Sequence, residues 1–208
     1  MSTVLNKISV SLLGCDLLNI EKELDFVKSL NINRLHVDIM DGHYVENFGF
    51  PLSIVKLIKS KYKNYFKFDF HLMVDNPLFS TQKIFSDIDY ENLIYHFDTV
   101  RNVSNKIGDK TKIKIAFRIN DDFGDIIKFI KTKNFKKVVL MAADIGKSGQ
   151  EMYCDVIDKI KMVKMQIPDV FLEIDGGINS KNIFKVLENG ADLVVTGSFF
   201  FQNKHFFK

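Results

Sequence analysis

The chain has 208 residues, a length typical of one large domain rather than two. Its 46% hydrophobic and 26% charged residues are typical of a packed globular protein and exclude an intrinsically disordered chain. The net charge of +3 is too small, and too evenly spread, to indicate a nucleic-acid-binding surface.

Cysteine content and the N-terminal residues indicate the cellular compartment. Cys15 and Cys154 are too few and too far apart for a disulfide framework or a Cys-x-x-Cys metal site. The first ten residues lack the basic and apolar segments of a secretory signal, and no uncharged apolar run approaches the roughly 20 residues that cross a bilayer. We therefore expect a cytoplasmic protein with no nucleic-acid or membrane partner. We also expect it to form a homo-oligomer.

Short runs of β-branched and apolar residues alternate with amphipathic segments along the chain. The expected strands cover residues 7–13, 34–40, 66–73, 92–97, 112–117, 136–141, 170–175 and 192–197. The clearest helices are expected at 17–30, 51–62, 155–166 and 179–190, the last with Asn179 and Ser180 as cap candidates and Gly190 at its end. Eight βα units of about 26 residues predict a single α/β domain over residues 1–208, a (β/α)8 TIM barrel with eight parallel strands. The alternative is a doubly wound open sheet, which normally has a glycine-rich turn after its first strand.

Polar pairs stand near the ends of three predicted strands. They are His36 with Asp38, Asp69 with His71, and Glu173 with Asp175. Residues two apart share one face of a strand, so each pair can point into the barrel mouth, where TIM barrels place their chemistry. For any single pair, the competing interpretation is a hydrogen-bonded layer of the core. Two imidazoles and two carboxylates, however, match the ligands of a divalent metal ion, Zn²⁺, Fe²⁺, Mn²⁺ or Co²⁺.

Several segments resemble the motifs of the ribulose-phosphate 3-epimerase family, in order and spacing, over nearly the whole chain. They are HVDIMDGHYVENF, FDFHLMVDNP, IYHF and EIDGGI. The resemblance implies a pentose phosphate pathway isomerase that interconverts D-ribulose 5-phosphate and D-xylulose 5-phosphate. It further implies one divalent metal ion held by His36, Asp38, His71 and Asp175. Asp38 and Asp175 would also serve as acid and base on opposite faces of the substrate.

The chemistry of these residue types agrees with that reaction. Inverting a carbon beside a ketone requires a proton to leave one face and another to arrive at the opposite face, and two carboxylates are sufficient for both transfers. The substrate contacts that the resemblance implies are Ser11, Met40, His71, Met73, Met141, Gly146, Gly149 and Gln150. For the three methionines, the competing interpretation is ordinary core packing.

Glycines follow the seventh and eighth predicted strands and indicate a phosphate site. Gly176 and Gly177 precede one helix, and Gly197 and Ser198 follow the last strand. Backbone N–H groups at such helix starts can bind phosphate without a charged side chain. The competing interpretation is that they are turn glycines.

Two loops depart from the family pattern. MAADIGKSGQ, after the sixth strand, lacks the usual proline, phenylalanine and one glycine, and it introduces Lys147, for which a solvated loop lysine is the simplest interpretation. Arg118 stands where asparagine is usual and can reach a second anionic or hydroxyl group of a different sugar. The alternatives are therefore an epimerase of a six-carbon ketose phosphate, a non-catalytic phosphosugar-binding barrel and a metal-dependent hydrolase.

Overall fold

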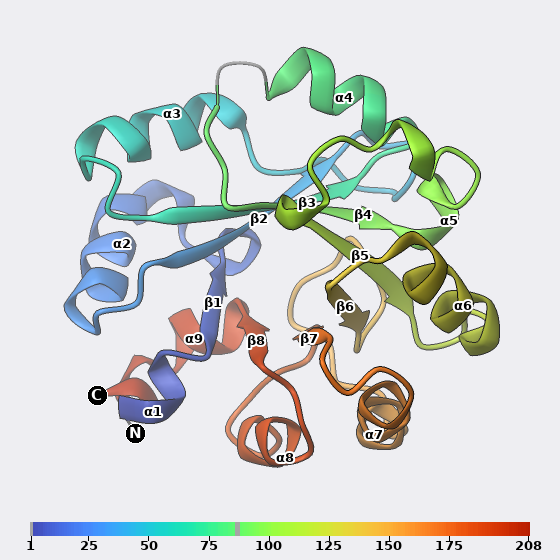
Figure 1. Ribbon diagram of the computed structural model, residues 1–208. Coiled ribbons are helices and arrows are strands. Elements are labelled where there is room, and N and C mark those ends of the chain that lie inside the picture. The colour runs from blue at the N-terminus through green and yellow to red at the C-terminus, as the bar shows by residue number, and fades with distance from the viewer. Residues whose placement is uncertain (1, 86–87) are drawn as a thin grey trace.

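The computed structural model describes residues 2–85 and 88–208. Within them, eight parallel strands form a closed barrel in chain order, with β1 pairing to β8 to complete the ring. Helices surround the barrel on the outside (Figure 1). The predicted (β/α)8 barrel is therefore confirmed, and the alternative open sheet is wrong.

All eight predicted strands are present, and their ends differ from the expected ones by no more than two residues. They are β1 (Ile8–Ser11), β2 (Arg34–Met40), β3 (Lys67–Met73), β4 (Asn92–His96), β5 (Ile113–Arg118), β6 (Lys137–Met141), β7 (Phe171–Asp175) and β8 (Leu193–Thr196).

The helices include the four expected ones, of which α8 is shorter than predicted. Asn182, rather than Asn179 or Ser180, stands before its first turn, and the Asn182 side chain instead accepts a hydrogen bond from the backbone N–H of Asn179. The α-helices are α1 (Ser2–Leu5), α2 (Ile20–Ser29), α3 (Leu52–Lys61), α4 (Pro77–Ile84), α5 (Phe97–Val100), α6 (Phe123–Lys133), α7 (Val156–Gln166), α8 (Ile183–Glu188) and α9 (Ser198–Gln202). Short 3-10 turns are η1 (Leu12–Gly14), η2 (Leu17–Asn19), η3 (Ser104–Lys106), η4 (Lys110–Lys112) and η5 (Lys204–Phe207).

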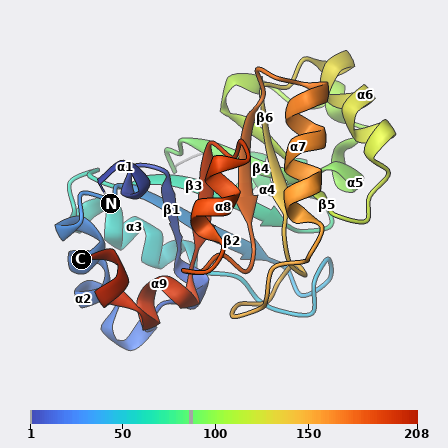
Figure 2. The same ribbon diagram turned by 90° about the horizontal axis from the view of Figure 1, so that it is seen from below.

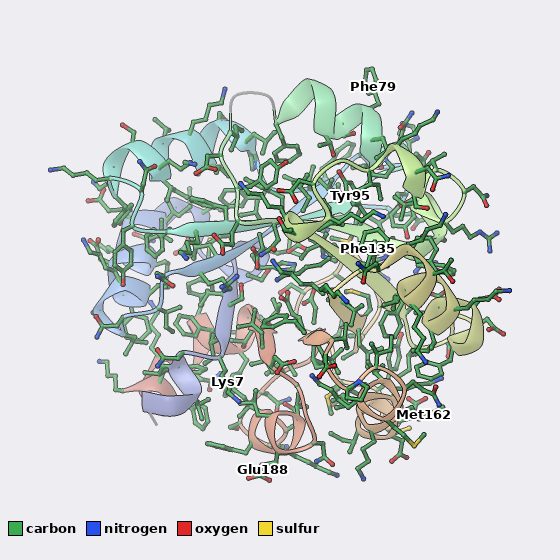
Figure 3. All side chains as sticks on the ribbon, in the orientation of Figure 1. Lys7, Phe79, Tyr95, Phe135, Met162 and Glu188 are labelled. Carbon is green, nitrogen blue, oxygen red and sulfur yellow. The ribbon has the colours of Figure 1, made fainter. Side chains whose placement is uncertain are left out.

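The main hydrophobic core lies between the barrel and its helices. Side chains alternate along each strand, so every second residue points outward into this layer. Tyr95 of β4 is an example, since it is buried and its hydroxyl lies 2.6 Å from the Thr81 hydroxyl of α4. In Figure 3, Phe79 of α4 and Met162 of α7 point away from the barrel instead, in agreement with their exposure.

The barrel interior holds a small apolar cluster and a large number of polar side chains. The apolar cluster consists of Ile94, Ala116, Val139 and Met141. Buried polar residues fill the remaining layers, and several come from the predicted polar pairs. The two chain termini lie close together, next to α1 and the C-terminal turns (Figure 2). In the residues that the structure describes, no helix is long and apolar enough to cross a membrane.

Candidate active site and metal centre

A cavity of about 290 Å³ opens at the carboxyl ends of the strands, where TIM barrels carry their active sites. The strands are parallel, so all the loops that follow them meet at this end of the barrel. Most of the residues predicted for the site line this cavity: Ser11, Asp38, His71, Met73, Met141, Gly146, Gly149, Gln150, Asp175, Gly176, Gly177, Gly197 and Ser198. The fold therefore brings together predicted residues from five strands, β1, β2, β3, β6 and β7, and from the loops after β6, β7 and β8.

Two predicted residues lie outside the cavity lining. His36 is fully buried beneath the cavity floor, and Met40 packs against Val45 and Met73. The Met40 contact supports the core-packing interpretation for this methionine. Met141 belongs to the apolar cluster of the barrel interior and also lines the cavity.

Four side chains converge at the cavity floor. Each of His36, Asp38, His71 and Asp175 offers one ligand atom, and these atoms lie within 4.8 Å of one another. His36 Nε2 lies 3.3 Å from both Asp38 Oδ1 and Asp175 Oδ2. His71 Nδ1 lies 3.1 Å and 3.5 Å from the same two oxygens. Two imidazole nitrogens and two carboxylate oxygens directed at one point fit the donor set of a divalent transition metal.

The register of the strands explains this convergence. Asp38 of β2 pairs with His71 of β3, so the two side chains lie at one level of the barrel. Asp175 stands at the end of β7, across the interior. His36 lies two residues earlier on β2 and reaches the cluster from below, with its Nε2 facing the carboxylates of Asp38 and Asp175.

Charge pairing governs the protonation of this cluster. Burial alone raises the pKa of both carboxyl groups, but the adjacent His36 imidazole outweighs it, so the pKa of Asp175 falls to about 2 and that of Asp38 lies well below its usual range. Burial disfavours the charged form of His36, yet the two carboxylates raise its pKa well above the usual value. The metal-free site is therefore a paired cluster in which protons and a metal ion compete for His36.

His96 supports the cluster from β4. Its Nε2 lies 2.8 Å from His71 Nε2, and the two rings are stacked with centroids 4.9 Å apart. Burial and the nearby His71 lower the pKa of His96 well below its usual value, so the ring is neutral near neutral pH. His96 belongs to the IYHF motif, but the sequence offered no reason to place it against His71.

The polar pairs are divided between two levels of the barrel. Asp38, His71 and Asp175 belong to the upper cluster, whereas Asp69 and Glu173 lie below it and bind the buried Lys114 of β5. Lys114 was not among the residues predicted for the barrel interior. The available signal was a lysine at an inward position of an otherwise apolar strand, KIKIAF.

Glycines at the end of β7 serve close backbone packing. Gly176 and Gly177 have φ angles of +116° and +66°, which favour glycine. A Cβ atom on Gly177 would lie 2.2 Å from the backbone nitrogen of Met152, in the loop after β6. Gly177 therefore has a structural requirement of its own, in addition to its place in the cavity lining.

The loops after β2 and β6 meet over the mouth. Asn47 donates its side-chain N–H to the carbonyl of Gly146 at 2.8 Å, and a Cβ atom on Gly146 would lie 2.9 Å from Val45. Gln150 lines the cavity, but its amide donates back to carbonyls of its own loop. Lys147 is an exposed residue at the cavity rim, as expected for a solvated loop lysine.

Arg118 binds within the protein instead of lining the cavity. Its Nη2 donates to the Tyr44 hydroxyl at 2.6 Å and lies 3.3 Å from Asp98 Oδ2. The Tyr44 ring lies against His96, with centroids 5.2 Å apart. Arg118 thus holds Tyr44 in place against the two stacked histidines. Its position does not support the expectation that it reaches a group of the sugar.

Comparisons with known proteins agree with this site. Residues 7–201 match the model of the ribulose-phosphate 3 epimerase family. The chain is 31% identical over 205 residues to the ribulose-phosphate 3-epimerase of Helicobacter pylori (strain J99), which covers 95% of this chain and 92% of that protein. It is 26% identical over 201 residues to the cytoplasmic isoform of ribulose-phosphate 3-epimerase from Oryza sativa subsp. japonica, which covers 94% and 87%.

Among solved structures, 3-hexulose-6-phosphate synthase from Salmonella typhimurium is similar with a TM-score of 0.67. The match covers 94% of this chain and 90% of that one at 15% identity, a level that shows a shared fold alone. The family match, in contrast, spans nearly the whole chain and includes the residues of the cluster. The chain therefore belongs to the ribulose-phosphate 3-epimerase family of carbohydrate isomerases.

Proposed function

We propose that this protein interconverts D-ribulose 5-phosphate and D-xylulose 5-phosphate with one divalent metal ion, Zn²⁺, Fe²⁺, Mn²⁺ or Co²⁺. The observation that carries the proposal is the pair of carboxylates, Asp38 on β2 and Asp175 on β7, which reach one point from separate strands of the barrel. Relatives of similar length that are named ribulose-phosphate 3-epimerase support the choice of substrate.

The two carboxylates are suited to inversion at carbon 3. One ionised aspartate removes the proton from carbon 3, the electrons of the C–H bond move toward the carbonyl oxygen at carbon 2, and the other aspartate returns a proton to the opposite face. In each direction of the reaction one aspartate starts ionised and the other starts protonated, and their protonation states are exchanged at the end. The lowered pKa of both carboxyl groups favours the ionised form, in which each acts as the base. Ser11 holds Asp38 through a 3.0 Å hydrogen bond.

His36, Asp38, His71 and Asp175 would hold the metal ion, as their converging ligand atoms suggest. When bound, a divalent cation supplies Lewis-acid stabilisation of the negative charge that develops on the substrate oxygens. His36 and His71 are fully buried at the cavity floor and would position the ion beside both aspartates. The apolar side chains of Met73 and Met141 complete the wall of the cavity next to the cluster.

The phosphate of the substrate would lie at the other end of the cavity. That end is formed by Gly177 after β7 and by Gly197 and Ser198 after β8. A Cβ atom on Gly149 of the β6 loop would lie 3.8 Å from Ser198 Oγ, so three loops surround this position. Their backbone N–H groups are the expected phosphate donors.

The alternatives have less support. A six-carbon substrate was suggested by Arg118, whose guanidinium is bound to Tyr44 and Asp98. A non-catalytic phosphosugar-binding barrel requires the backbone donors but has no use for two opposed carboxylates. A hydrolase requires an acid for the leaving group in addition to this cluster.

Incubation of the purified protein with ribulose 5-phosphate and one of the four metal ions tests the proposal. We expect xylulose 5-phosphate to form until equilibrium is reached. Asp38→Asn and Asp175→Asn should each abolish net epimerisation while leaving the barrel folded. Full activity of either variant would contradict the proposed roles of the two aspartates.

A further inference from the structure

A buried charged layer lies directly below the metal cluster. Lys114 of β5 is 1% exposed, and its ammonium group donates to Asp69 Oδ2 at 2.7 Å and to Glu173 Oε2. Asp69 also accepts hydrogen bonds from Asn92 at 2.6 Å and from Arg34 at 3.2 Å. Asp69 is thus fully engaged, whereas Glu173 has one carboxylate oxygen that Lys114 does not use.

The unused oxygen of Glu173 faces the unused nitrogen of His36. Glu173 Oε1 and His36 Nδ1 lie 3.6 Å apart, at ion-pair distance and slightly longer than an ordinary hydrogen bond. Both side chains are fully buried, and neither atom has a hydrogen-bond partner among the residues that the structure describes. Unpaired buried polar atoms are costly, so an N–H on one side and a carboxylate oxygen on the other are natural partners.

The opposite nitrogen of His36 belongs to the metal cluster. His36 Nε2 lies 3.3 Å from Asp38 Oδ1 and from Asp175 Oδ2. A neutral imidazole carries its proton on one nitrogen and offers a lone pair on the other. A proton on Nδ1 therefore leaves Nε2 free to act as a ligand, whereas a proton on Nε2 blocks it.

We propose that Glu173 is a positioning residue that accepts the Nδ1–H of His36 and so directs the lone pair of Nε2 to the metal. Lys114 contributes by occupying Glu173 Oε2, which fixes the carboxylate with Oε1 toward His36. Metal-binding histidines commonly donate their second N–H to a carboxylate, and loss of that partner weakens metal binding. This inference rests on the proposed metal site and assigns a task to the charged layer beneath it.

Glu173→Gln tests the proposal with almost no change of volume. The Lys114 ammonium can donate only to the carbonyl oxygen of the new amide, so the NH₂ group is left facing His36. That group donates to Nδ1 and moves the imidazole proton to Nε2. We expect the affinity for Zn²⁺, measured by competition with a chromophoric chelator, to fall about 10- to 100-fold.

Asp69→Asn is the matched control. Asp69 is buried in the same layer and bound to the same lysine, but its hydrogen-bond partners are Lys114, Asn92 and Arg34 rather than His36. We expect Asp69→Asn to lower the thermal stability while leaving the affinity for Zn²⁺ near that of the wild type. An equal loss of affinity in Asp69→Asn and Glu173→Gln would show that the layer acts only through general packing.

A double variant separates positioning from packing. In Lys114→Met with Glu173→Gln, no ammonium group holds the amide oxygen, so the glutamine can turn its carbonyl toward the Nδ1–H of His36. We expect this double variant to recover most of the Zn²⁺ affinity that Glu173→Gln loses. A double variant that binds Zn²⁺ more weakly than Glu173→Gln would contradict the proposal.

Nitrogen-15 NMR of the His36 side chain provides a measurement that needs no variant. In the Zn²⁺-loaded wild type we expect His36 to bind the metal through Nε2 and to carry its proton on Nδ1, beside Glu173 Oε1. A Zn²⁺-loaded wild type in which His36 binds the metal through Nδ1 would overturn the inference, even if Glu173→Gln failed to fold. A wild type that binds none of the four metal ions would instead overturn the proposed metal site.

Discussion

Ser11 and Asp38 are joined by a hydrogen bond between neighbouring strands, in which Ser11 Oγ donates to Asp38 Oδ2 over 3.0 Å. The bond occupies one oxygen of the carboxylate. The other oxygen, Oδ1, lies 3.3 Å from His36 Nε2 and 3.1 Å from His71 Nδ1. Ser11 therefore fixes which oxygen of Asp38 faces the histidines, in addition to lining the cavity.

Ser11→Ala should lower kcat/KM about tenfold, since a hydrogen bond to a charged group is worth about 1.5–3 kcal/mol and part of its loss is recovered by water. Ser9→Ala is the control, because Ser9 is buried on the same strand and its hydroxyl has no partner among the described residues. Steady-state kinetics with ribulose 5-phosphate measures both. Equal losses in the two variants would contradict the role of the Ser11 bond.

The stability of the metal-free protein should fall as the pH rises above about 6.5. His36 and His71 have raised pKa values in the folded protein. Their contribution to the free energy of unfolding is therefore fully present below the pKa of a histidine in the unfolded chain, and it is lost as the pH rises through the pKa in the folded protein. Asp38 and Asp175 have lowered pKa values, so they affect the stability only at acid pH. Their contribution to the free energy of unfolding is lost as the pH falls through their pKa in the folded protein, which is about 2 for Asp175.

Saturating Zn²⁺ should reverse the trend above pH 6.5, because metal binding requires neutral imidazoles and competes with protons. The thermal unfolding midpoint, measured with and without Zn²⁺ across this range, tests the reversal. The control is His36→Ala, in which both trends should weaken. A metal-free midpoint that rises with pH above 6.5 would be incompatible with the proposed pairing.

Ser198→Asp should raise KM for ribulose 5-phosphate about tenfold or more while kcat changes less, since a carboxylate at this end of the cavity repels the substrate phosphate. Ser198→Ala keeps the backbone N–H and should remain close to the wild type. Comparing these two Ser198 variants tests the phosphate site better than a substitution of Gly177 would, because any side chain at Gly177 would clash with the backbone of Met152. An unchanged KM in Ser198→Asp would place the phosphate elsewhere.

Arg118→Met should lower the unfolding midpoint without changing the preference between five-carbon and six-carbon ketose phosphates. The reason is that Arg118 binds Tyr44 and Asp98 and does not line the cavity. Arg101→Met, at an exposed position after α5, is the control for the loss of one positive charge. A tenfold change in the ratio of the kcat/KM values for the five-carbon and six-carbon ketose phosphates would show that Arg118 contacts the substrate.

The fold was predictable because it depends on local patterns, whereas the set of four converging side chains was an implication of the family resemblance. Alternation along the strands marks the inward residues, and a spacing of two places His36 and Asp38 on one face. The helix expected at 179–190 was less accurate, since the backbone N–H of Asn179 bonds to the Asn182 side chain and the first helical turn starts later.

Contacts between distant strands could not be predicted in the same way. The pairing of His96 with His71, and of Lys114 with Glu173, depends on how far side chains reach across the barrel interior. No spacing in the sequence encodes that reach. For the same reason the unusual Arg118 was predicted to contact the substrate, whereas in the structure its guanidinium donates to the Tyr44 hydroxyl.

The isotope content of the product, after epimerisation in deuterated water, tests the two-carboxylate mechanism most directly. If one aspartate removes the proton and the other delivers a different one, xylulose 5-phosphate formed in the first turnover must carry solvent deuterium at carbon 3. Asp38→Asn or Asp175→Asn should form no epimer, although the surviving base can still exchange the carbon 3 proton of one epimer. Product without deuterium in the wild type would contradict the mechanism, because it would require a single group to carry the same proton from one face to the other.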